Sequence, residues 1–131
     1  MKFFLLADDD NDDAQLFEEA LTQIHLPVTF RHLEDGQDVL AFLEHQQELP
    51  DIIFLDINMM RMTGWDCLSA IKKNERYRHI DVIMYSTSES KRDKEKAKSL
   101  GAAGFLTKPT EFRCLVDTLE KLASGEVVSI W

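Results

Sequence analysis

Residues 3–9 read FFLLADD, a short apolar run that ends in two carboxylates, Asp8 and Asp9. A second run of the same kind, IIFL at residues 52–55, ends in Asp56. Short apolar runs that alternate with helical patterns are typical of buried parallel strands. The carboxyl ends of such strands meet at one edge of the sheet, where ligands bind. We therefore expect the three carboxylates to lie close together.

The same edge is predicted to receive an ammonium group. A third apolar run, Phe105–Thr107, ends in Lys108, and Pro109 follows. Carboxylates that lie close together repel each other and favour a bound cation. Hard oxygen ligands in that arrangement suit Mg²⁺. The residues alone thus predict a magnesium site beside a lysine.

Strand and helix patterns alternate along the whole chain. Apolar residues at steps of three and four, such as Ala14, Phe17 and Leu21, predict a helix after the first strand. The expected strands are Phe3–Ala7, Val28–Leu33, Ile52–Leu55, Val82–Tyr85 and Phe105–Thr107, with a helical pattern after each. Right-handed crossovers make such a sheet parallel. The predicted fold is α/β, a five-stranded parallel sheet with helices on both faces and the most apolar strand, Ile52–Leu55, at its centre.

Length and charge limit the classes of function. With 131 residues the chain is expected to form a single domain, 1–131, with a core over about residues 2–123 and a short tail, 124–131. Lys and Arg number 15 against 24 Asp and Glu, a formal charge of −9. This acidity argues against direct binding to DNA, because phosphate backbones attract basic surfaces.

The cysteines and the hydropathy pattern indicate a cytoplasmic protein. Cys67 and Cys114 form no CxxC pair, so neither a disulfide framework nor a cysteine metal site is expected. The four histidines lack metal-ligand spacing and are expected at the surface or in packing roles. No apolar stretch reaches the length of a membrane span, and the chain turns acidic too early for a signal peptide.

Three further segments, two charged and one apolar, are expected to have structural rather than functional roles. Asp12 and Asp13 are expected only to favour the positive end of the following helix. The basic stretch Lys91–Lys98 is expected to be a solvated helix face, with a partner surface as the second interpretation. The tail Glu126–Trp131 is expected to be a loosely packed terminus, and a dimer-forming strand is the alternative.

Five motifs at the predicted strand ends carry a family resemblance. In chain order they are Leu6-Ala7-Asp8-Asp9-Asp10, Leu55-Asp56-Ile57-Asn58-Met59, Met62-Thr63-Gly64, Ser86-Thr87-Ser88 and Lys108-Pro109. Each motif is weak alone, but together and in this order they are highly specific. Over nearly its whole length the chain resembles a bacterial two-component response-regulator receiver domain, of the stand-alone kind seen in chemotaxis. The resemblance implies a doubly wound, flavodoxin-like sheet with strand order 2-1-3-4-5.

The resemblance also implies the chemistry of the site. Asp56 would accept a phosphoryl group from a sensor histidine kinase or a histidine phosphotransfer protein. Asp8, Asp9, Asp56 and the backbone carbonyl of Asn58 would hold Mg²⁺. Lys108 would pair with the phosphoryl group, and its bond to Pro109 would be cis.

The implied output is a phosphorylation-dependent change of surface. Ser86 would move to meet the phosphoryl group, and Phe105 would act as an aromatic switch for an unknown downstream protein. Such a phosphoprotein of a phosphorelay is not an enzyme, although it is expected to remove its own phosphoryl group with water. A cytoplasmic monomer or weak homodimer is expected.

One position departs from the family pattern, and other functions remain open. Met60 stands where the family usually has proline, so the loop after Asp56 is expected to be less stiff. The first alternative is a pseudo-receiver that binds partners without phosphorylation. A flavin carrier would need a loop that cradles phosphate after the first strand, and here that loop is acidic. An aspartate-nucleophile phosphatase would usually carry a second aspartate at the position of Asn58.

Overall fold

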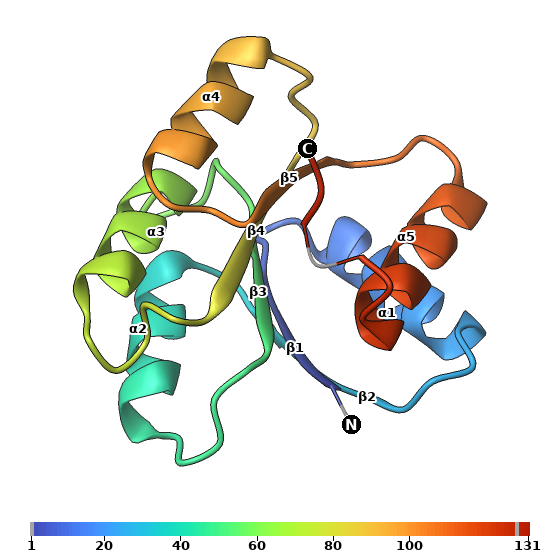
Figure 1. The fold of residues 1–131 in the computed structure, drawn as a ribbon, viewed down its shortest axis with the longest axis horizontal. Helices are drawn as coiled ribbons and strands as arrows, with labels where there is room; N and C mark the ends of the chain where they lie inside the picture. The colour runs from blue at the N-terminus through green and yellow to red at the C-terminus, as the bar shows by residue number, and fades with distance from the viewer. Residues whose placement is uncertain (1, 128) are drawn as a thin grey trace.

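The computed structural model describes residues 2–127 and 129–131, and within them strands and helices alternate (Figure 1). The strands are β1 (Lys2–Ala7), β2 (Val28–Leu33), β3 (Ile52–Leu55), β4 (Asp81–Ser86) and β5 (Gly104–Thr107). The helices are α1 (Asn11–Gln23), α2 (Gly36–His45), α3 (Gly64–Lys73), α4 (Lys91–Ser99) and α5 (Phe112–Ser124). Two of the five predicted strands, β2 and β3, have the expected bounds; β1 and β5 begin one residue earlier, and β4 is one residue longer at each end.

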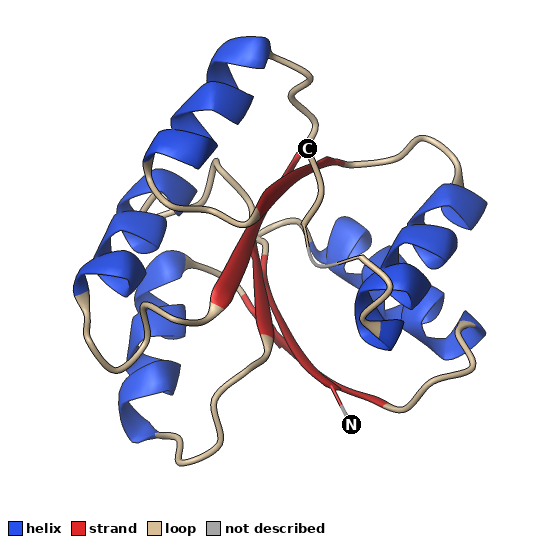
Figure 2. Cartoon of the chain, in the orientation of Figure 1, coloured by secondary structure: helices blue, strands red, loops and turns tan. Residues whose placement is uncertain are grey.

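The strands form one parallel sheet in the order β2-β1-β3-β4-β5. This is the flavodoxin-like order that the family resemblance implies. Helices α1 and α5 cover one face, and α2, α3 and α4 cover the other (Figures 1 and 2). The predicted fold class is therefore confirmed, with β3 at the centre of the sheet.

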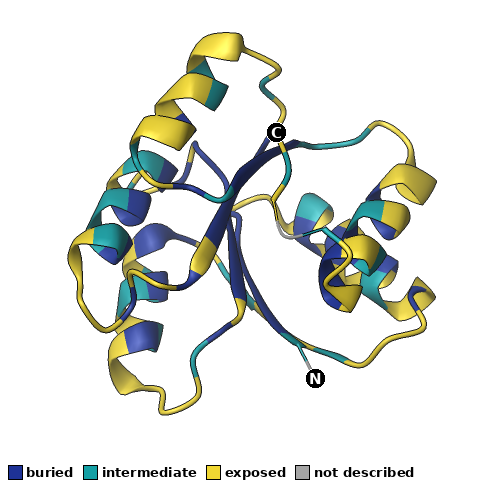
Figure 3. Cartoon of the chain, in the orientation of Figure 1, coloured by how far each residue is buried: buried dark blue, intermediate teal, exposed yellow. Residues whose placement is uncertain are grey.

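One apolar core lies on each side of the sheet (Figure 3). On one side Phe17 of α1 packs edge-on against Phe54 and Tyr85 of the sheet. On the other side Leu68 and Ile71 of α3 are fully buried under the sheet. Strand β3 is buried at every position because both cores cover it, which explains its uniformly apolar sequence.

Polar side chains set the start of four helices. Asp10, Asp35, Thr63 and Ser90 each accept a backbone N–H of the first turn of the helix that follows. These bonds satisfy N–H groups that have no partner inside the helix. Because Asp10 is the cap of α1, its side chain is committed to that helix.

Helix α4 is held more weakly than its neighbours. Ala97 is its one buried residue, although Lys96 lies 4.7 Å from the centre of the Trp65 ring on α3. The basic stretch is thus mainly a solvated helix face, as the sequence predicts. A helix with so little buried apolar surface can shift at low cost.

The end of the chain packs against β5, which corrects the expected loose terminus. The Phe105 amide donates to the carbonyl of Ile130 at 2.7 Å, and Ile130 is partly buried against the core on the α1–α5 side. The Lys98 ammonium lies over the ring of Trp131, 4.8 Å from its centre. Gly104 permits this approach, since a Cβ there would lie 2.4 Å from the Ile130 oxygen. Within the predicted tail, residue 128 lies outside the described residues, and Ile130 and Trp131 make contacts within the chain.

Helix length and hydropathy give no candidate for crossing a membrane in the part of the chain that the structure describes.

Candidate functional site

The carboxyl edge of the sheet brings the predicted polar residues together. Backbone bonds set this edge, because Asp56 N donates to Ala7 O at 2.9 Å and Lys108 N donates to Ser86 O at 2.7 Å. Each of these donors is the first residue after its strand, so each side chain starts from the rim of the sheet. The polar residues after β1, β3, β4 and β5 thus share one small region, as the sequence predicts.

The Lys108 ammonium is the positive centre of this region. Its Nζ lies 2.7 Å from Asp13 Oδ2, 2.9 Å from Asp8 Oδ2 and 3.6 Å from Asp56 Oδ2. Burial alone would lower the pKa of Lys108, but the bonds to Asp13 and Asp8 outweigh it, and the pKa lies well above its ordinary value. Lys108 therefore remains charged and is shared among three carboxylates.

The expected cis bond before Pro109 is absent, since the described residues include no cis peptide. The two isomers of a bond before proline differ by only about 0.5–1 kcal/mol, so either can be selected by its surroundings. Lys108 reaches the carboxylates through its long side chain, and the trans bond does not prevent this.

Three carboxylates form a candidate cation site. Oxygen atoms of Asp8, Asp9 and Asp56 all lie within 4.8 Å of one another. Asp8 is fully buried, and its Oδ1 accepts the Asp10 amide at 2.9 Å. Its Oδ2 is paired with the Lys108 ammonium at 2.9 Å and accepts no backbone N–H. A carboxylate oxygen can take more than one partner, so a divalent cation could bind here beside the ammonium.

The carboxyl of Asp56 has a raised pKa in this cluster. It is 8% exposed, and burial raises its pKa from 3.8 to about 6, with the Lys108 charge opposing the rise and the Asp8 charge adding to it. One lysine is thus insufficient to balance the buried negative charge. A bound cation would favour the ionised form of Asp56.

Ser86 lies at the end of β4 in a hydrogen-bonded loop. Its Oγ accepts the Ser88 amide at 3.2 Å, and the Thr107 hydroxyl donates to the Ser88 carbonyl at 3.0 Å. The Ser88 hydroxyl in turn donates to Asp93 of α4 at 2.7 Å. A chain of bonds therefore links the candidate site to the first turn of α4.

Phe105 is buried in this structure, with 1% of its surface exposed. Its side chain belongs to the core on the α2–α3–α4 side of the sheet. The family resemblance implies a switch role for Phe105, but the ring is already inside, so no rotation from solvent into the core is available from this structure. Burial of phenylalanine accounts for this orientation.

Sequence reasoning missed two groups near the site. It gave Asp13 only a helix-end role, but Asp13 makes the shortest contact of Lys108. Its position four residues after Asp9, on the helix that leaves the site, was the available signal. It also missed Arg61, which pairs with Asp35 through its guanidinium. No local pattern indicates that pair, because 26 residues separate the partners.

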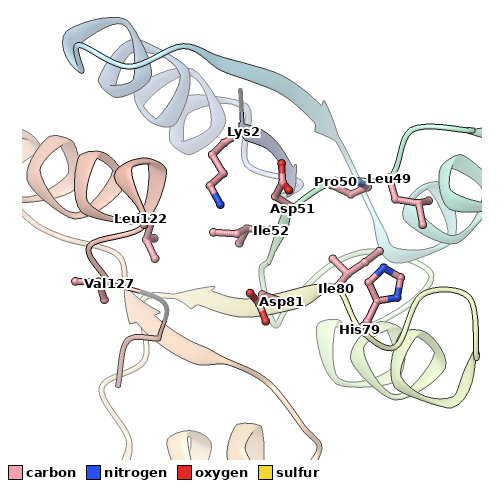
Figure 4. A pocket seen from close by; sticks show the side chains of 11 residues that line it. Lys2, Leu49, Pro50, Asp51, Ile52, His79, Ile80, Asp81, Leu122 and Val127 are labelled. Atoms are coloured by element: carbon pink, nitrogen blue, oxygen red, sulfur yellow. The ribbon is translucent and has the colours of Figure 1, made fainter.

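A separate cavity of about 330 Å³ lies at the opposite edge of the sheet (Figure 4). Lys2, Asp51, Ile52 and Asp81 line it near the amino ends of β1, β3 and β4. It contains neither the three clustered carboxylates nor Lys108, so the predicted chemistry belongs to the carboxyl edge.

The raised pKa of Asp56 predicts a pH-dependent stability in the absence of metal. Between about pH 3.8 and 6 the folded state holds a proton on Asp56 that the unfolded state releases, so stability falls as pH rises through this window. Asp56→Asn removes the ionising group and should raise the free energy of unfolding at about pH 7 by about 2 kcal/mol. The gain should disappear below about pH 4. Urea unfolding in a chelator checks this, with exposed Asp117→Asn as the control, and an equal gain at both pH values would contradict it.

The chain is similar in sequence to known proteins of one family. The chain matches the family of response regulator receiver domains over residues 4–120. It is 33% identical over 122 residues to the probable methanogenesis regulatory protein FilR2 of Methanothrix harundinacea, across 90% of this chain and 79% of that protein. It is 29% identical over 128 residues to the response regulator Rcp1 of Synechocystis, across 94% of this chain and 87% of that protein.

Solved structures agree with the fold. The Mn²⁺-bound form of Rcp1 has a TM-score of 0.82 at 28% identity, covering 95% of this chain and 93% of that chain. The chemotaxis response regulator CheY4 of Vibrio cholerae has a TM-score of 0.78 at 29% identity, covering 93% of this chain and 98% of that chain. The matched family segment contains Asp8, Asp56 and Lys108. With its fold and its clustered carboxylates, this chain belongs to the response regulator receiver domain family of two-component signalling.

Proposed function

We propose that Asp56 accepts a phosphoryl group from a sensor histidine kinase or a histidine phosphotransfer protein. The observation that carries the proposal is the convergence of Asp8, Asp9 and Asp56 within one cluster, with Lys108 against it. Asp56 is the acceptor because it follows the central strand, and its carboxylate lies in the cluster with Asp8 and Asp9, 3.6 Å from the Lys108 ammonium. The whole chain, 1–131, would act as one receiver unit.

The residues present can perform the transfer. The Asp56 carboxylate attacks phosphorus, the bond from phosphorus to the donor nitrogen breaks, and an acyl phosphate forms on Asp56. The Lys108 ammonium favours the ionised nucleophile and is close enough to pair with the incoming oxygens. Such a transfer depends mainly on position and on neutralisation of charge. Water would later break the new phosphorus–oxygen bond, so the domain would return to its resting state without a second protein.

Mg²⁺ fits the cation site better than a softer metal, since every available ligand is an oxygen. Asp8, Asp9 and Asp56 would hold it with the backbone carbonyl of Asn58. When bound, the ion supplies neutralisation of the charge on the transferring oxygens. Asp10 would take no part, because its side chain caps α1.

Phosphorylation would change the surface near α4. The added group brings negative charge and strong acceptor oxygens, and the Ser86 hydroxyl gains a charge-assisted hydrogen bond by turning to it. This turn would disturb the Ser88 amide that now donates to Ser86, and with it the bond from Ser88 to Asp93. Helix α4 can follow because Ala97 is its one buried residue. Phe105 would act as part of this switch from its buried position, and the altered face would meet a downstream protein.

A phosphorylation-independent pseudo-receiver is the weaker alternative. It explains the fold but gives no reason for a fully buried Asp8, a raised Asp56 pKa and a shared Lys108 in one place. A binding module would be more stable without this cluster of like charges.

Asp56 is predicted to be the phosphoacceptor. Incubation with acetyl phosphate and Mg²⁺ should add the mass of one phosphoryl group to the intact protein. Asp56→Asn should abolish the addition, because the amide is a poor nucleophile, and Asp117→Asn on the surface of α5 should retain it. Continued phosphorylation of a folded Asp56→Asn variant would disprove the assignment.

Mg²⁺ binding is predicted to need Asp9 much more than Asp10. Asp9→Ala removes an oxygen of the carboxylate cluster and should weaken the affinity by about tenfold or more. Asp10→Ala removes the cap of α1 and should mainly lower the melting temperature. Calorimetric titration of Mg²⁺ into each folded variant separates the two effects. Equal weakening by both substitutions would show that Asp10 also contributes to the site.

Binding of beryllofluoride, a phosphoryl mimic, is predicted to change amide exchange between Ser88 and Phe105. The Ser88 and Ser90 amides should respond first, because both donate to serine hydroxyls in the loop before α4. Asp56→Asn, which cannot hold the mimic, is the control. Unchanged protection in wild-type protein with the mimic bound would mean that this domain does not switch through α4.

A further inference from the structure

The loop after Asp56 contains one strained residue, Arg61. Its φ is 64°, and among the described residues it is the one residue other than glycine with a positive φ. L residues avoid this left-handed region unless surrounding contacts hold them there. The contacts of Arg61 therefore need an explanation beyond solvation of an exposed charge.

Arg61 reaches from this loop to the start of α2. Its Nε and Nη2 donate to Asp35 Oδ2 at 2.8 and 2.5 Å, and Nη2 also donates to Asp38 Oδ1 at 3.1 Å. Two donors of one guanidinium on a single oxygen, plus a third contact, define its orientation closely.

Asp35 is a fixed partner for this guanidinium. Its side chain is 7% exposed, and its Oδ1 accepts the Asp38 amide at 3.0 Å as the cap of α2. Burial alone would raise the pKa of Asp35, but bonds from the Asp38 amide and from Arg61 lower it below its ordinary value. One carboxylate thus connects the first turn of α2 to the loop after Asp56.

Apolar contacts hold other parts of the loop, including Met62, which packs against the core on the α2–α3–α4 side. Ile57 and Met59 are buried, and Gly64 N donates to Ile57 O at 2.8 Å. Between them Asn58 and Met60 are exposed, and Met60 is 71% exposed. The guanidinium of Arg61 is therefore the polar anchor of the exposed turn that follows the Asn58 carbonyl, beside the apolar contact of Met62.

We propose that Arg61 is a positioning residue, whose ion pair with Asp35 holds the loop so that the Asn58 carbonyl faces the cation site. This inference rests on the proposed function, since it assigns a use to the Mg²⁺ site described above. Arg61 touches neither the metal nor the phosphoryl group. Its effect on phosphorylation would pass through metal affinity alone.

The test compares Mg²⁺ affinity in variants of the full chain. Arg61→Ala should weaken Mg²⁺ binding by about tenfold, as loss of a group that orients a metal ligand does. Arg61→Gly should weaken it similarly, although glycine relieves the backbone strain. Arg61→Lys should retain only part of the affinity, because an ammonium cannot reproduce the paired N–H donors of the guanidinium. Arg113→Ala removes a surface arginine paired with Asp117 on α5 and is the matched control.

Asp35→Asn tests the same contact from the other side. Asparagine keeps the ability to cap α2 but loses the charge, so its effect on Mg²⁺ affinity should resemble that of Arg61→Ala. The double variant should bind Mg²⁺ no more weakly than either single variant, since both changes break one interaction. If Arg61→Ala does not fold, Asp35→Asn carries the test.

Kinetics distinguish positioning from a general loss of stability. At saturating Mg²⁺ the rate of phosphorylation by acetyl phosphate should return to the wild-type value in Arg61→Ala. Unchanged Mg²⁺ affinity in folded Arg61→Ala and Asp35→Asn would overturn the inference, whatever their melting temperatures. Failure of wild-type protein to bind Mg²⁺ or to become phosphorylated would instead refute the proposed function.

Discussion

One ammonium shared by too many carboxylates is the constraint on which this molecule depends. Lys108 contacts Asp8, Asp13 and Asp56, and Asp9 adds a fourth negative charge at the rim. Burial raises the pKa of Asp56, and the neighbouring Asp8 charge adds to the rise while Lys108 opposes it. A site in this condition binds a cation readily, and it responds strongly when a phosphoryl group adds further charge. The clustered charges lower the stability of the folded domain without metal, and they make the site responsive to a cation and to a phosphoryl group.

The parallel sheet makes this crowding possible and keeps it in place. Strand ends that are paired through backbone bonds cannot separate to relieve repulsion between the side chains that follow them. The close approach of Gly64 adds to this rigidity, because a Cβ there would lie 2.2 Å from the Asp56 carbonyl oxygen. The loop after Asp56 therefore packs directly on the backbone of the candidate nucleophile, and substitution of Gly64 would displace both together.

Strands and their polar ends could be predicted from the sequence because both depend on local pattern. The apolar run of β3 has clear limits, and parallel pairing of β1 with β3 then requires Asp56 to lie near Asp8. Contacts that depend on the reach of one side chain could not be predicted, as with Asp13 on Lys108 and Arg61 on Asp35. The isomer before Pro109, the buried Phe105 ring and the packed tail depend on tertiary surroundings for the same reason.

The packed tail gives the sheet two differently protected edges. On the β5 side the Phe105 amide donates to the carbonyl of Ile130, so this amide is not free to pair with an added strand. On the β2 side the neighbouring strand is β1 alone, and exposed Arg31 discourages an apolar strand from adding there. Two copies of this chain could not extend the sheet through β5 unless the tail first left it. The β5 edge is thus protected by the last residues of the chain, and proteolytic removal of Ile130 and Trp131 would free the Phe105 amide to pair with another strand.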